Sequence, residues 1–94
     1  MTLEALSSVL RETRAILARS DNDFTWSSWQ DGEQALAEID DLLRQVATGR
    51  IADLGSLNVL FAPTGPLQEV SLESGWGEEF LALAAKFDSA IADL

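Results

Sequence analysis

The residue types that carry most enzyme chemistry are absent or isolated in this sequence. Its 94 residues include no histidine and no cysteine. The chain therefore lacks the usual general base, thiolate nucleophiles, disulfides and a cysteine-based zinc site. Lys86 is the only lysine, and it lies beside Phe87 on the predicted solvent side of a helix, which disfavours a Schiff base. We expect a protein that is not an enzyme and that binds no cofactor.

One short motif has the spacing of a metal site at first inspection. Asp21-Asn22-Asp23 lies between two predicted helices, as a calcium loop would. A twelve-residue calcium loop needs glycine at position six and a bidentate glutamate at position twelve. Counting from Asp21 places Trp26 and Gly32 at those two positions. The motif therefore predicts a helix-ending turn, and we expect no metal site.

The remaining acids do not form a catalytic pair. Glu69 and Glu73 share one face of a predicted strand, but four residues along a strand span about 13 Å. That separation is large for paired acid–base catalysis. Asp40 and Asp41 are adjacent on a predicted helix. Their carboxylates are more simply explained as part of a solvated helix face than as metal ligands.

The tryptophans are more informative than the acids alone. Trp26 and Trp29 are three residues apart at the start of the second predicted helix, and Trp76 stands at the start of the last one. Two interpretations stay open: the rings close the end of a small core, or some lie partly exposed among acids. Exposed aromatic rings rimmed by acids are typical of a site for a basic peptide or protein. The predicted partner-binding residues are Asp21, Asp23, Trp26, Trp29, Asp31, Glu33, Asp40, Asp41, Glu69, Glu73 and Trp76.

The net charge of the chain is also consistent with a basic protein partner. Sixteen acids face six bases, for a net charge of −10. Direct binding to nucleic acid is excluded on this ground, because neutralising phosphates needs a basic face. The acidity serves solubility, or it steers a basic protein partner onto the surface. Seven of the acids fall within residues 20–50, so a steered partner would bind there.

Hydrophobic spacing predicts an antiparallel pair of helices at the N-terminal end. Leucines three and four residues apart favour a first helix from Leu3 to Ala18, with Thr2 as its N-cap. A polar turn follows. The second helix is predicted from Ser27 or Ser28, where Ser27 and Gln30 match a capping box, to Thr48, with Gly49 just after its end.

The pattern changes after a connector at residues 50–56. Leu57, Val59 and Phe61 alternate with Asn58, Leu60 and Ala62, and apolar and polar residues alternate over 69–73. This period of two predicts two strands around the turn Pro63-Thr64-Gly65-Pro66. A last helix is predicted from Gly77 to Ala92. The expected fold is therefore α+β: an N-terminal antiparallel αα-hairpin, a short β-hairpin, and a C-terminal helix packed on the first two helices.

The chain is expected to form one small domain over residues 1–94. It has no apolar run long enough to span a membrane, and its early charges interrupt any signal-peptide core, so we expect a cytoplasmic protein that does not bind membranes. The leading hypothesis is a non-enzymatic module that binds a protein partner with a basic surface. In size and charge only, without a shared motif, the chain is similar to immunity proteins and antitoxins. The alternatives are a structural domain that forms a homodimer, and a small-ligand binder or enzyme of unknown class.

Overall fold

The regular structure is entirely α-helical in the residues that the computed structural model describes, which are 3–25, 27, 29–49, 54–63 and 65–92. These residues contain five helices and no strand. The predicted α+β class is therefore wrong, and so is the predicted β-hairpin. In chain order the helices are α1 (Glu4–Leu17), α2 (Gly32–Ala47), α3 (Leu54–Leu60), α4 (Pro66–Ser74) and α5 (Gly77–Ala92).

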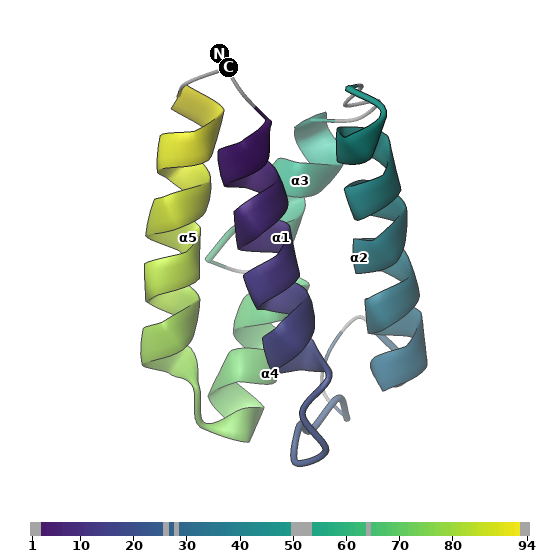
Figure 1. The fold of residues 1–94 in the computed structure, drawn as a ribbon. Helices are drawn as coiled ribbons and strands as arrows, with labels where there is room; N and C mark the ends of the chain where they lie inside the picture. Colours follow the sequence, from purple (N-terminus) through teal and green to yellow (C-terminus); the bar gives the residue numbers. More distant parts are fainter. Residues whose placement is uncertain (1–2, 26, 28, 50–53, 64, 93–94) are drawn as a thin grey trace.

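Helix α1 lies at the centre of the arrangement. It packs against α2 on one side and α5 on the other, and both neighbours run antiparallel to it (Figure 1). Helices α3 and α4 lie behind this layer, where α4 packs against α5 and α3. Among the described residues, no Cα of α5 comes within 8 Å of α2. The expectation that the last helix packs on both N-terminal helices is therefore wrong for α2.

The two N-terminal helices follow the predicted apolar spacing. Helix α1 differs from the predicted range by one residue at each end, while the predicted N-cap Thr2 lies outside the described residues. Helix α2 begins later than predicted, because Asp31 is its N-cap and accepts a 2.9 Å hydrogen bond from the Gln34 amide. Ser27 instead stabilises a preceding turn, where its hydroxyl donates to the Phe24 carbonyl. Gly49 follows the end of α2 with a φ of 77°, as predicted.

Residues 66–74 form α4 because their buried positions have helical spacing. Leu67, Val70 and Ser71 are buried, whereas Leu72 is 67% exposed. In a strand, Val70 and Leu72 would share one face. Pro66 occupies the first turn, where its missing N–H costs no helical hydrogen bond, so it starts a helix instead of ending a turn.

The same explanation applies to the other predicted strand. Leu57, Leu60 and Phe61 are buried, three and four residues apart, while Val59 points to solvent with 62% of its surface exposed. The short helix α3 therefore buries one face. The connector residues 50–53 lie outside the described residues.

Gly65 joins α3 to α4 at a very close approach. A Cβ atom at this position would lie 2.1 Å from the carbonyl oxygen of Val59, so only glycine fits. Its own N–H donates to the Ala62 carbonyl at 2.9 Å, and its carbonyl accepts from the Glu69 amide. The backbone of Gly65 therefore links the end of α3 to the start of α4 through these two hydrogen bonds.

An aromatic stack and two linked hydrogen bonds connect the helices and the loop after α1. Phe61 and Phe87 stack with ring centroids 4.3 Å apart, which fastens the end of α3 to α5. The Trp76 indole donates a 2.8 Å hydrogen bond to Asn22, whose amide in turn donates to the Ile16 carbonyl at 2.7 Å. None of the described helices is long and apolar enough to cross a membrane.

Candidate functional site

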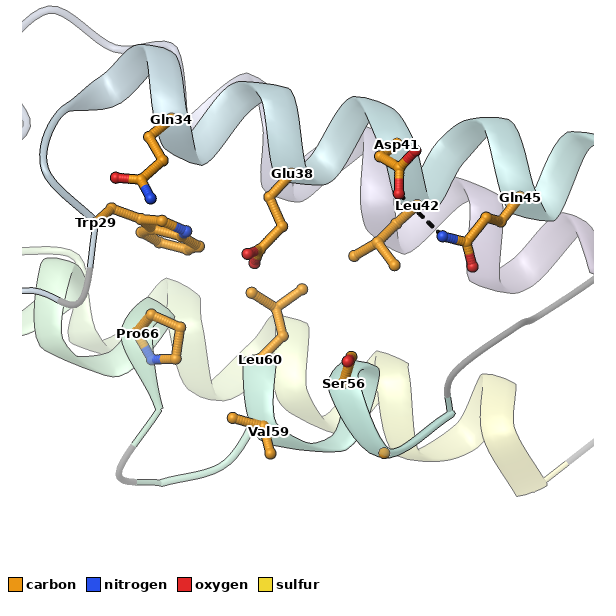
Figure 2. Close-up of a pocket in the computed structure, with 11 residues that line it drawn as sticks. Trp29, Gln34, Glu38, Asp41, Leu42, Gln45, Ser56, Val59, Leu60 and Pro66 are labelled. Carbon is orange, nitrogen blue, oxygen red and sulfur yellow. Dashed lines mark hydrogen bonds between the residues drawn. The ribbon is translucent and has the colours of Figure 1, made fainter.

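An open groove lies between α2 and α3 (Figure 2). Its volume is about 690 Å³. It exists because the two helices are held apart: among the described residues, no Cα of α2 lies within 8 Å of α3. Helix α2 is fastened to α1, whereas α3 is fastened to α4 and, through Phe61, to α5. The groove is therefore the space between two separately anchored helices.

The α2 wall of the groove presents polar side chains along one helical face. Positions 34, 38, 41 and 45 are three and four residues apart, so they share that face. From Gln34 to Gln45 the wall extends over about 17 Å, given a rise of 1.5 Å per residue. Leu42 lies below this row and adds apolar surface to the groove.

Two carboxylates stand on this wall, and their surroundings differ. Asp41 accepts hydrogen bonds from Arg44 at 3.2 Å and from Gln45 at 3.0 Å. Glu38 is exposed and has no hydrogen bond or ion pair with any other described residue. Figure 2 shows its carboxylate extending from α2 across the groove towards Leu60. Glu38 is therefore a negative charge in the groove that no described lysine or arginine pairs with.

The opposite wall is small and apolar. Gly55 and Ser56 occupy the first turn of α3 and leave space, while Val59 and Leu60 follow one turn later. Leu60 points across the groove towards α2 in Figure 2. Trp29 and Pro66 close one end of the groove.

Trp29 is held in place by an aromatic contact. The ring of Phe24 meets it edge-on, with centroids 6.5 Å apart and an interplanar angle of 65°. Only 4% of the surface of Trp29 is exposed, so it forms a rigid end wall rather than a broad contact surface. Trp76 is equally buried and lies outside the groove, and Trp26 lies outside the described residues.

The predicted acids are distributed over several parts of the surface. Asp21 and Asp23 lie in the loop after α1, where hydrogen bonds from Thr25 hold the pKa of Asp23 below its usual value. The Asp23 amide also donates to the Ser74 hydroxyl, which ties this loop to the end of α4. Asp31 caps α2, and Glu33 is exposed in the first turn of α2.

Asp40 has a structural partner on another helix. Its two carboxylate oxygens accept from Arg14 at 2.6 and 3.3 Å, which joins α2 to α1. This hydrogen-bonded pair lowers the pKa of Asp40. Glu69 and Glu73 lie one turn apart on α4, about 6 Å between Cβ atoms, instead of far apart on a strand.

The structure thus brings Trp29 and Asp41 to one groove and leaves the other described candidates outside it. The sequence interpretation did not select Gln34, Glu38, Gln45, Val59 or Leu60. The signal was present in part, because Glu38 precedes Asp41 by three residues and shares its helical face. The sequence pattern predicts a strand at Val59 and Leu60 and a connector at Gly55 and Ser56, so it does not link these residues to α2.

The groove places the carboxylates of Glu38 and Asp41 near the apolar side chains of Leu42 and Leu60. Among the described residues, no three histidine, cysteine, aspartate or glutamate side chains are grouped closely enough to hold a metal ion. No protein-family model, curated protein or solved structure matches this chain. The geometry and charge of the groove are therefore the basis for a functional assignment.

Proposed function

We propose that this protein is a non-enzymatic interaction module that binds a basic segment of a protein partner in the groove between α2 and α3. The observation that carries the proposal is Glu38, an exposed carboxylate that forms no ion pair with the described residues, set in an open groove with Leu60 on the opposite wall. A lysine or arginine from a partner would supply the missing charge.

The charge of the whole chain supports the same choice. A net charge of −10 creates an attractive field for a basic partner and speeds its encounter. Exposed charges are screened within about 8 Å at physiological ionic strength. The field therefore supports association in general, whereas Glu38 and Asp41 give the partner a specific position.

The contact surface is small. Leu42 and Leu60 are already largely buried. The Val59 side chain is exposed but points away from α2 in Figure 2, so little apolar surface is exposed inside the groove. An interface of this size belongs to the class below about 1,200 Å², which is typical of transient complexes. We expect dissociation constants on the order of micromolar.

The test compares three forms of the immobilised protein in a quantitative pull-down from its native cells. These are the wild type, the double variant Glu38→Lys/Asp41→Lys and the control Asp88→Lys. Asp88 is exposed on α5, away from the groove. We expect a protein with a basic segment to bind the wild type and the control and to be lost from the double variant. If every bound protein is retained by the double variant, this groove is not the binding site.

A second candidate function is self-association. Leu72 on α4 and Leu81 on α5 are each about two-thirds exposed, and the two helices pack against each other. A two-fold dimer would cover them. Analytical ultracentrifugation at high micromolar concentration should then show a dimer that Leu72→Gln/Leu81→Gln dissociates. A monomeric wild type would contradict this function.

A further inference from the structure

We propose that the segment bound in the groove is an amphipathic α-helix with two cationic side chains one turn apart on the side that faces α2. This inference rests on the proposed function, that the groove binds a basic segment, and adds the conformation and the charge spacing of that segment.

The walls of the groove favour a helical ligand over an extended one. An extended peptide is recognised by adding a strand to a sheet edge, whose free backbone groups supply the hydrogen bonds. The described residues contain no strand, and both groove walls are helices. Helices satisfy their backbone groups internally, so α2 and α3 present side chains to a ligand. A helix, which also satisfies its own backbone, loses no hydrogen bond in such a groove.

A polyproline segment fits less well. Proline-rich peptides dock against exposed aromatic rings. Trp29 is the only aromatic residue among those that line the described groove, and its surface is nearly all covered by Phe24 and the core. The groove therefore lacks the flat aromatic platform that a polyproline helix needs.

The dimensions of the α2 wall set the length and the charge spacing of the ligand. A wall of about 17 Å corresponds to about three turns of helix, or roughly eleven ligand residues. Glu38 and Asp41 are three residues apart, so their carboxylates stand about one turn apart along the groove. A ligand helix lying along α2 meets both with lysine or arginine at positions i and i+3 or i+4.

The α3 wall sets the apolar side of the ligand. Leu60 faces the groove and offers contact to a leucine, methionine or phenylalanine side chain of the ligand. Val59 is largely exposed and lines the groove with its side chain pointing away from α2, so it offers contact only at the rim. Gly55 and Ser56 leave room for one such side chain to reach between the walls. Basic residues towards α2 and apolar residues towards α3 together define an amphipathic helix.

The experiment is a selection from displayed random peptides of about 16 residues. The wild type is the target, and the double variant Glu38→Lys/Asp41→Lys is the counter-target. We expect the peptides that discriminate to carry two basic residues three or four apart and apolar residues at helical spacing. Proline at the centre of a selected peptide should weaken binding at least about tenfold, whereas proline at its first position should be tolerated.

Each outcome separates this inference from the proposed function. The helical ligand would be overturned if the discriminating peptides lacked helical spacing or tolerated the central proline. The proposed function, a groove that binds basic segments, would then still stand. A selection in which no peptide distinguishes the two targets would overturn both. Val59→Lys is a second variant, which adds a positive charge to the α3 wall and repels a basic ligand. It should weaken the binding of the selected peptides by about tenfold. Unchanged affinity would place the ligand elsewhere.

Discussion

Glu38 and Asp40 are only two residues apart, yet their surroundings are opposite. Two residues along a helix correspond to about 200° around its axis. Asp40 therefore faces α1 and is held by Arg14, whereas Glu38 faces the groove and has no cationic partner among the described residues. The difference comes from the neighbouring helices, because the two side chains carry the same charge.

The ion pair between Asp40 and Arg14 predicts a specific dependence of stability on pH. The pair holds the pKa of Asp40 below its usual value of 3.8. A lowered pKa in the folded state contributes stability above the unfolded value, and this contribution is lost as pH falls through the folded value. Asp40→Asn should therefore lower the melting temperature at about pH 7, and the difference from wild type should be smaller at about pH 3, below the unfolded value.

Asp41→Asn is the matched control on the same helix. Its partner Arg44 lies three residues away in an exposed pair, which contributes little. Melting curves followed by circular dichroism compare the three proteins at both pH values. Equal melting temperatures for wild type and Asp40→Asn at about pH 7 would contradict a stabilising role for this pair.

At the scale of elements, α4 is the helix that the sequence pattern described as a strand. The same residues also fit a helix, because Val70 and Ser71 follow Leu67 by three and four positions and all three are buried. Burial separates the two patterns. Val70 is inside and Leu72 is outside, which only the helix allows.

Val70→Ala and Leu72→Ala test that assignment directly. Val70→Ala should destabilise the fold by about 1–3 kcal/mol, because it leaves a cavity in the core. Leu72→Ala should change the stability by less than about 0.5 kcal/mol, because the side chain is exposed. The free energies of unfolding come from urea titration. Similar losses from both substitutions would indicate that the two side chains share a buried face, as in a strand.

The junction between α3 and α4 predicts the effect of a single methyl group. Gly65→Ala should destabilise the protein by about 1–3 kcal/mol, since the new Cβ would clash with the Val59 carbonyl and backbone must move. Gly77→Ala is the matched control, because its Cβ would make only an ordinary contact with Leu72. We expect that change to be neutral or to stabilise by up to about 1 kcal/mol. Equal stability of the two variants in urea titration would refute the close approach.

For the whole molecule, the excess of acids determines the net electrostatic contribution to stability. Sixteen acids in a small chain repel one another, and six bases cannot neutralise them. Apart from the pair of Arg14 with Asp40, which makes two part-buried hydrogen bonds, the described ion pairs use Arg19, Arg44 and Lys86. These lie at the exposed surface, where they contribute little. Repulsion among acids should therefore outweigh attraction in the folded state.

Added salt should then stabilise the protein. Raising sodium chloride from about 0.05 M to about 0.5 M shortens the screening length several-fold and weakens the repulsion. We expect the melting temperature to rise by a few degrees, measured by circular dichroism. Asp88→Lys, which lowers the net negative charge, should show a smaller rise. A fall in melting temperature with salt would mean that the surface ion pairs dominate.

The sequence alone determined the helices whose apolar stripes are long. The range of α5 agrees with prediction, and that of α1 agrees to within one residue at each end, because a 3.6-residue period repeated over several turns has no competing interpretation. The glycine after α2 also agrees with prediction. The acidic charge and the absence of histidine and cysteine were equally readable. These features depend on local order along the chain and on composition.

Only the tertiary structure decided the short helices and the groove. Leu54–Leu60 and Pro66–Ser74 are too short for their period to be distinguished from alternation, and burial against α5 and the core settles them. The groove depends on the separation of α2 from α3, which follows from where each is anchored. No local pattern reports that distance, so the position of Glu38 opposite Leu60 emerges only when the helices are packed.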